Sequence, residues 1–207
     1  MPDLKRELPT PGGVLDYWIG AATDDHLFAN QQHKLWFTKS TATDAFIVRH
    51  FSDLFAALTE GLADEWAAAG ARARLAAIIV LDQFSRNMFR GDARAFSSDP
   101  LARRLAAQGV EAGEDQTLTE IERSFFYLPF EHSEDLADQD ESIRLFETLA
   151  RDARDVFRPI CTSSLDYAHR HRDIIRKYGR FPHRNEVLQR ENRPEETDYL
   201  SKPGAGF

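Results

Sequence analysis

Hydrophobic residues recur along most of this chain at steps of three and four positions. The clearest case is TDAFIVRHFSDLFAALTEGL, residues 43–62, where Phe46, Phe51, Leu54 and Leu58 fall on one side of a helix. Thr119 and Glu122 have the spacing of a capping box, Asp99-Pro100 suggests an N-cap followed by a first-turn proline, and Gly179 is a helix stop. The same pattern predicts helices over 10–20, 24–37, 71–90, 121–128, 138–157 and 159–179.

Strict alternation of apolar and polar residues does not extend over a full strand anywhere in the sequence. The apolar run AAIIVLDQF, residues 76–84, fits a buried strand as well as a helix by periodicity alone. A single strand would have no partner to pair with, so a helix is favoured. Neither a low-complexity linker nor a fixed-period repeat is recognisable. The pattern predicts one all-α domain of helical hairpins over residues 1–207.

The stretch LDQFSRNMFR, residues 81–90, carries polar side chains on a segment with the pattern of a buried helix. On a helical wheel Asp82 and Arg86 lie within an apolar stripe, in the favourable order for an i,i+4 ion pair. One interpretation is a structural ion pair, which adds little net stability when buried. The other is an internal cleft in which the arginines bind an anion and the asparagine orients it. The polar residues beside the stripe are Gln83, Asn87 and Arg90.

A second polar group follows Pro129 in YLPFEHSED, residues 127–135. His132 lies between Glu131 and Glu134, and a histidine beside carboxylates can serve as general acid or base. The alternative is a helix cap in solvent. The spacing matches neither a zincin nor a di-iron Glu-x-x-His pattern, so no metal site is predicted.

The third group lies in AHRHRDIIRKYGRFPHRN, residues 168–185. The helical pattern turns His171 inward, where it is either a core residue or a candidate catalytic group. The turn after Gly179 is made rigid by Pro182, and loops with clustered cations and an amide often carry function. Its candidate ligand-binding residues are Arg180, His183, Arg184 and Asn185.

Composition narrows the function classes. The formal charge of −8 argues against nucleic-acid binding, because an acidic protein is repelled by phosphate backbones. Cys161 is the single cysteine, which excludes an internal disulfide and fits a small buried hydrophobe in a reducing compartment. We expect a cytoplasmic protein that does not insert in membranes, because a signal peptide and a run of ~20 apolar residues are both lacking. The aromatic-rich helices are compatible with a homodimer.

Four motifs together resemble the bacterial domain of unknown function (DUF) 924 family across nearly the whole chain. They are VLDYWIG at 14–20, LDQFSRNMFRGDARAF at 81–96, FFYLPFEHSEDLADQ at 125–139 and HRDIIRKYGRFPHRN at 171–185. The resemblance implies an all-α fold of tetratricopeptide-like helical hairpins and brings no established reaction. The family's polar motif residues map onto Asp82, Gln83, Arg86, Asn87, Arg90, Glu131, His132, Glu134, His171, Arg180, His183, Arg184 and Asn185.

Three functions remain open at this point. The favoured one is binding of a small anionic ligand, bearing phosphate or carboxylate, in a cleft formed by the three polar segments. The second is a hydrolase or transferase in the same cleft, with His132 or His171 as acid–base and Glu131 or Glu134 orienting it. The third is a protein-interaction scaffold with a purely structural polar core. Nucleophile-elbow, P-loop, dinucleotide and zinc motifs are lacking, which removes the commonest enzyme templates. No cofactor is predicted.

Overall fold

The computed structural model describes residues 7–206, and over these residues it consists of helices and connections without a β-strand. The all-α fold class is therefore confirmed. Packing of the hairpins in a tetratricopeptide-like manner stays a prediction. The α-helices are α1 (Pro11–Trp18), α2 (His26–Phe37), α3 (Thr41–Ala57), α4 (Ala63–Ala68), α5 (Ala71–Ile78), α6 (Ser85–Met88), α7 (Asp99–Glu111), α8 (Glu120–Glu131), α9 (Leu136–Asp152), α10 (Arg158–Tyr178) and α11 (Pro194–Leu200).

Short 3-10 and π segments connect several of these helices. The 3-10 turns are η1 (Gly20–Thr23), η4 (Ala93–Phe96), η5 (Glu114–Thr117) and η6 (Pro182–Arg184), and the π segments are η2 (Leu58–Leu62) and η3 (Ile79–Phe84). The predicted helix over 71–90 is thus α5, η3 and α6 in succession, ending at Met88.

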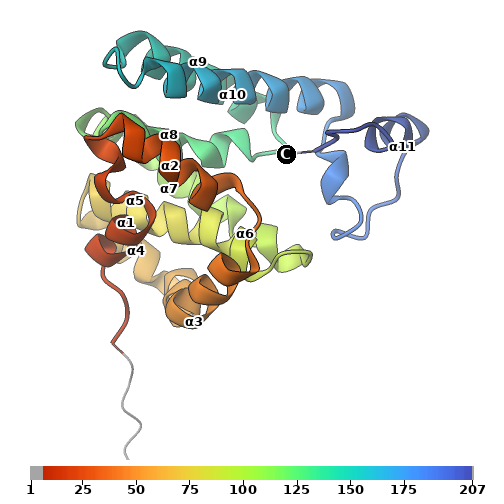
Figure 1. The fold of residues 1–207 in the computed structure, drawn as a ribbon. Helices are drawn as coiled ribbons and strands as arrows, with labels where there is room; N and C mark the ends of the chain where they lie inside the picture. Colours follow the sequence, from red (N-terminus) through yellow and green to blue (C-terminus); the bar gives the residue numbers. More distant parts are fainter. Residues whose placement is uncertain (1–6, 207) are drawn as a thin grey trace, which may run out of the picture.

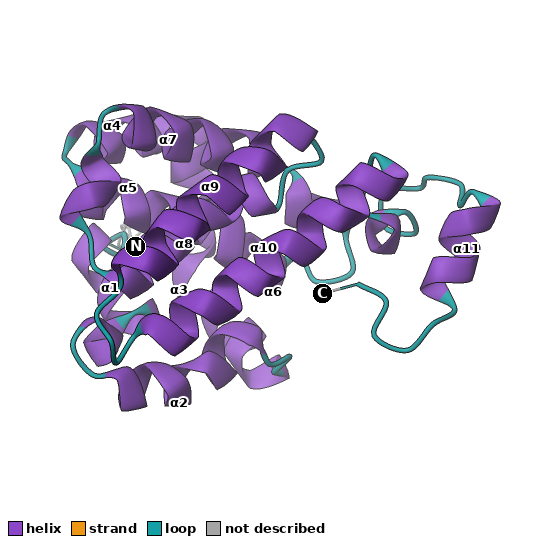
Figure 2. Ribbon diagram, turned by 90° about the horizontal axis from the view of Figure 1, so that it is seen from above, coloured by secondary structure: helices purple, strands orange, loops and turns teal. Residues whose placement is uncertain are grey.

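The long helices α9 and α10 lie side by side and cover α8, while the N-terminal helices pack on the other side of α8 (Figures 1 and 2). The chain then leaves the end of α10, and α11 stands away from the main body (Figure 1). The C-terminal ends of α8 and α10 face α11 (Figure 1). The polar segments 127–135 and 168–185 lie at these two ends.

Local signals set several helix boundaries. Thr119 and Glu122 form the expected capping box at the start of α8, and Gly179 ends α10 in the left-handed conformation with φ 69°. The prediction for Asp99 was wrong. Ser98 precedes the helix, α7 begins at Asp99, and the carboxylate of Asp99 binds an arginine instead of capping.

Apolar side chains from nearly all the helices form one buried cluster, and the interior of α5 and η3 lies at its centre. Every residue from Leu75 to Leu81 is fully buried, and Phe84 packs edge-on against Trp18 with ring centroids 5.1 Å apart. Cys161 is also fully buried, as predicted. The polar residues of η3 therefore enter the core because both flanks of the segment are anchored in it.

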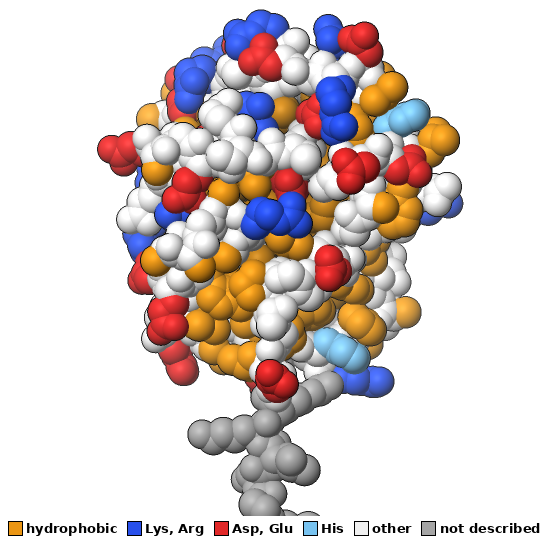
Figure 3. All heavy atoms as spheres, turned by 90° about the vertical axis from the view of Figure 1, so that its left-hand side faces the viewer, with side chains coloured by type: hydrophobic (Ala, Val, Ile, Leu, Met, Phe, Trp, Pro, Cys, Tyr) orange, Lys and Arg blue, Asp and Glu red, His pale blue; other side chains and the backbone are white. Residues whose placement is uncertain are grey.

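The outer surface also carries apolar side chains. On the side of the molecule where α1, α4 and α5 lie, they form a broad patch crossed by few charges (Figure 3). Formation of a homodimer stays a prediction. Within residues 7–206, none of the helices combines the length and the hydropathy needed to cross a membrane.

Candidate functional site

The three polar segments predicted from the sequence meet in space. A carboxylate oxygen of Asp82 lies 2.8 Å from Nδ1 of His132, although the two residues are 50 positions apart. A carboxylate oxygen of Glu131 lies 3.0 Å from Nδ1 of His171 on α10. We call the assembled group the central polar cluster: Asp82, Arg86, Asp99, Glu131, His132, Glu134, His171, His183 and Arg184.

The π segment η3 positions Asp82. Widened turns of this kind are frequent at functional sites, because they change the direction of side chains within a helix. Asp82 is only 1% exposed, and the side-chain amide of Gln83 donates to it over 2.6 Å. Burial would raise the pKa of Asp82, but the positive charge of Arg86 and the contact with His132 lower it well below its usual range. Asp82 is therefore a buried, ionised carboxylate.

Arg86 links two acids. Its guanidinium donates to both carboxylate oxygens of Asp99 at 3.0 Å each, and its nearest distance to the carboxylate of Asp82 is 3.3 Å. The predicted i,i+4 ion pair is thus present. Burial raises the pKa of Asp99, against the lowering effect of Arg86. The guanidinium of Arg86 is consequently paired with two acids of the protein itself.

The end of α8 carries the first histidine. Glu131 is the last residue of the helix and His132 is its C-cap. The Gln139 side chain donates to the carbonyl oxygens of Glu131 and Ser133 over 2.7 Å each, which satisfies groups left open at a helix end. Burial lowers the pKa of His132, and 14% of its side chain remains exposed. The ring is therefore mainly neutral at pH 7 and reachable from solvent.

The second histidine comes from α10. Its Nδ1 lies 2.9 Å from the carbonyl oxygen of Tyr167, one turn earlier, and the rings of His132 and His171 have centroids 6.1 Å apart. One ligand atom each from Glu131, His132 and His171 lies within 4.8 Å of the others. Sequence spacing did not predict this grouping, because it depends on how α10 packs against the end of α8.

Arg184 differs from the other arginines of the site. It is 6% exposed, its Nη1 lies 3.7 Å from a carboxylate oxygen of Asp99, and its Nε has no hydrogen-bond partner among the described residues. Its guanidinium carbon lies 4.6 Å from the ring centroid of Phe96 and 4.4 Å from that of Phe181. Burial, with the charge of Arg86, lowers the pKa of Arg184 to about 10. Burial and the charge of Arg184 lower the pKa of His183 to about 4.

Two predicted residues lie apart from the cluster. Asn87 and Arg90 both bind Asp44 at the start of α3, with bonds of 2.8 Å from Asn87 and of 2.8 and 2.9 Å from Arg90. Arg90 is exposed. This contact ties α6 to α3 at the surface.

Three others are tied to the C-terminal segment. Arg180 donates two bonds of 2.7 Å to Glu196 of α11, and Asn185 donates to the same carboxylate over 3.2 Å. Glu134 accepts from the backbone N–H of Phe181 over 2.7 Å and from Arg190 over 2.7 and 3.0 Å. Glu134 thus attaches the turn after α10 to the end of α8.

Sequence reasoning missed the acidic partners of these arginines and the two aromatic rings beside Arg184. Asp44, Asp99 and Glu196 are acids near helix starts, and in sequence each looks like an ordinary helix-terminal acid. No local signal distinguishes such an acid from one that reaches a distant guanidinium.

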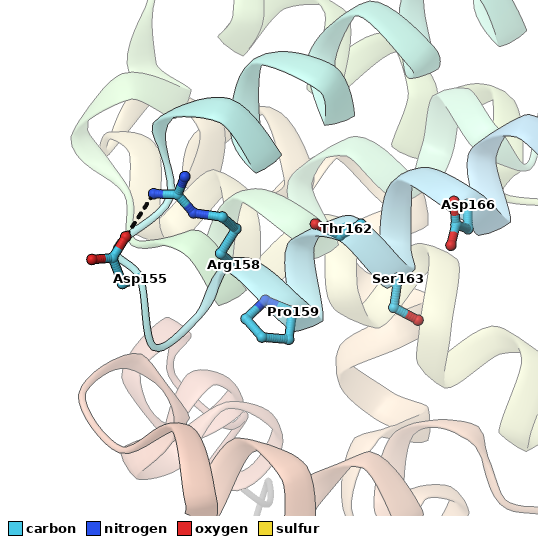
Figure 4. A pocket seen from close by; sticks show the side chains of 6 residues that line it. All are labelled: Asp155, Arg158, Pro159, Thr162, Ser163 and Asp166. Atoms are coloured by element: carbon cyan, nitrogen blue, oxygen red, sulfur yellow. Dashed lines mark hydrogen bonds and ion pairs between the residues drawn. The ribbon is translucent and has the colours of Figure 1, made fainter.

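Surface depressions lie elsewhere. One is lined along the start of α10 by Asp155, Arg158, Pro159, Thr162, Ser163 and Asp166, with Arg158 donating to Asp155 over 2.8 Å (Figure 4). Another lies beside α1 and α3 and is lined by Tyr17, Phe46 and His50, among others. Neither contains a residue of the central polar cluster.

Comparison with known proteins gives the family. The family described as bacterial protein of unknown function, DUF924, matches residues 14–204. The chain belongs to this family. The DUF924 chain is also similar to the solved structure of a protein of unknown function, ATU0120, from Agrobacterium tumefaciens. The two are 38% identical with a TM-score of 0.75, over 92% of this chain and 96% of the other. A comparison with proteins of curated function returned no match.

Proposed function

We propose that this protein binds a small anion bearing phosphate or carboxylate at the central polar cluster, with Arg184 as the principal ligand. The observation that supports this function is the unequal pairing of the arginines. Arg86, Arg90, Arg180 and Arg190 each donate two hydrogen bonds to a single carboxylate. Among the described residues, Arg184 has its ion pair with Asp99 at 3.7 Å, and Arg86 already binds that carboxylate.

A buried guanidinium without a close counter-ion is costly, because it loses its hydration and gains little in return. An anion in the plane of the guanidinium would supply charge-assisted hydrogen bonds. Phe96 and Phe181 lie against the guanidinium and contribute cation–π attraction, so the N–H groups at its edge are the ones suited to an anion. Two acids of the cluster already have close arginine partners, since Arg86 donates to Asp99 and Arg190 donates to Glu134.

The test is a titration of the full chain with inorganic phosphate and with succinate at constant ionic strength, followed by calorimetry and thermal unfolding. Wild type is expected to bind at least one of them and to melt at a higher temperature. Arg184→Gln is expected to lose that response, because the guanidinium that would bind the anion is removed.

Arg176→Gln is the matched control. Arg176 lies on exposed α10 surface and the variant loses the same charge, so the response to the anion should persist. If neither anion binds wild type, or if Arg184→Gln responds as wild type does, the anion site is wrong. The bidentate pairing of the remaining arginines would then favour the scaffold interpretation.

A second function, acid–base catalysis on the bound anion, is supported by the 2.8 Å contact between Asp82 and His132. A carboxylate on Nδ1 fixes the ring and leaves Nε2 to exchange protons, as in other histidine–carboxylate pairs. A separate assay tests this function. Catalysis would appear as turnover of p-nitrophenyl phosphate or p-nitrophenyl acetate by wild type that is lost in His132→Gln.

A further inference from the structure

The central polar cluster contains three side chains with the donor set of a transition-metal site. We propose that Glu131, His132 and His171 bind one divalent first-row ion, of which Zn²⁺ is the representative. Their ligand atoms all lie within 4.8 Å of one another. Around a tetrahedral zinc ion, with metal–ligand bonds near 2.1 Å, neighbouring ligand atoms are about 3.4 Å apart. Side-chain rotations that move the ligand atoms by about an ångström would therefore bring them to the distances of a tetrahedral site.

The outer contact of His132 is that of a metal ligand. A histidine that binds a metal almost always donates its other ring N–H to a carboxylate or a backbone carbonyl, which fixes the ring and its tautomer. Nδ1 of His132 lies 2.8 Å from the carboxylate of Asp82, so its Nε2 would coordinate the ion. Nδ1 of His171 lies 2.9 Å from the carbonyl of Tyr167 and 3.0 Å from the carboxylate of Glu131, so His171 and Glu131 are already in contact where the ion would bind.

The charge of Glu131 also supports a metal site. Glu131 is 3% exposed, and its ion pair among the described residues is with His171, whereas the neighbouring acids Asp99 and Glu134 each have an arginine. A buried carboxylate needs a cation. A divalent ion between Glu131 and the two imidazoles would supply it, with the carboxylate of Asp82 behind His132 as a second negative charge.

The donor set selects the class of ion. Imidazole and carboxylate ligands suit Zn²⁺ and other first-row divalent ions, whereas Mg²⁺ and Ca²⁺ prefer oxygen ligands alone. Three protein ligands leave at least one coordination position for water or a bound anion, as in catalytic more than in structural zinc sites. The partly exposed ring of His132 marks the side from which the ion would enter.

The test uses the full chain after removal of metals with a chelator. Addition of Co²⁺ is expected to give visible absorption bands that saturate near one equivalent and are displaced by Zn²⁺ but not by Mg²⁺. His171→Gln is expected to weaken binding by more than the roughly 10–100-fold that loss of an outer-shell partner causes. Asp82→Asn, which alters the outer contact of His132 without removing a proposed ligand, is expected to fall within that 10–100-fold range.

His169→Gln is the matched control, because His169 lies two residues away on the exposed face of the same helix. It should leave Co²⁺ binding unchanged. His132→Gln provides a second ligand variant at a partly exposed position, in case His171→Gln does not fold. Wild type that binds neither Co²⁺ nor Zn²⁺, or ligand variants that bind as wild type does, would overturn the site. The proposal is independent of the anion site, because Arg184 is not one of the three proposed ligands of the ion.

Discussion

Cys161 lies in the first turns of α10 without exposed surface, and burial raises the pKa of its thiol from 9.0 to about 11. Because the thiolate is the reactive form, the shift alone lowers reactivity about 100-fold near pH 8. We expect iodoacetamide to label the native protein at pH 8 at least ~100-fold more slowly than the urea-unfolded chain.

The same thiol makes the stability of the fold depend on pH, and the raised pKa gives the sign of that dependence. Its native pKa is raised, so the unfolded chain loses the proton first as pH rises. The stability associated with the neutral thiol is therefore present below about pH 9 and is lost between about pH 9 and 11. Rapid labelling of native protein at pH 8 would contradict the buried position. Cys161→Ala should abolish labelling in both states.

Arg184 and Glu131 have a common property. Both are buried, and neither has a bidentate arginine–carboxylate pair among the described residues, because Arg184 lies 3.7 Å from Asp99 and Glu131 pairs with His171. The two proposed ligands, an anion and a divalent cation, have opposite charges. Both ligands would lie within the central polar cluster, where His183 interacts electrostatically with Arg184 and also with His171 and His132.

Among the elements, α7 and α8 are in tight contact at Gly109. A Cβ added there would collide with the ring of Phe126, which is fully buried, and would lie 2.8 Å from Cδ of Arg74. Alanine is favoured over glycine in a helix by about 1 kcal/mol. Overpacking a tight core costs about 1–3 kcal/mol, so we expect Gly109→Ala to lower the free energy of unfolding in urea denaturation.

Gly12 in α1 is the comparison for that prediction. A Cβ at Gly12 would have Thr10 Oγ1 as its nearest atom, at 3.8 Å, so Gly12→Ala gains helix propensity without a clash. Its stability should equal or exceed that of wild type. A Gly109→Ala variant as stable as wild type would show that α7 and α8 can separate at no cost.

The sequence predicted those features of the helices that depend on residues a few positions apart in the chain. The Thr119 capping box, the Gly179 stop and the inward face of His171 were all read from local spacing, and the structure has them. The π segment at Ile79–Phe84 was not predicted, because a regular helix and a widened one have the same apolar pattern.

Across the whole molecule, the site depends on contacts that no local pattern specifies. Asp82 meets His132 across 50 residues, and Glu134 meets Arg190 across 56. The sequence identified the polar segments by their unusual composition, but the pairing of each arginine with its acid follows from tertiary packing. That pairing reduced four candidate arginines to Arg184 as the proposed anion ligand.

The C-terminal segment provides a test at this largest scale. Glu196 of α11 is fully buried and accepts from Arg180, Asn185 and the backbone N–H of Arg193, and the hydrogen bonds from Arg180 help to lower its pKa to about 2. Since α11 stands away from the main body (Figure 2), this buried carboxylate is one of the links that attach it, together with the contact between the rings of Tyr178 and Tyr199. Local opening of such a peripheral unit does not require global unfolding.

We therefore expect Glu196→Gln to release α11, seen as amide hydrogen exchange over residues 194–200 at least about tenfold faster than in wild type. The thermal midpoint of the main body should change little, because the core cluster contains no residue of α11. Glu195→Gln removes the same charge from the exposed neighbouring position and should exchange as wild type does. If instead Glu196→Gln lowers the midpoint of the entire chain, α11 is an integral part of the cooperative fold, and the turn that carries Arg184 depends on it.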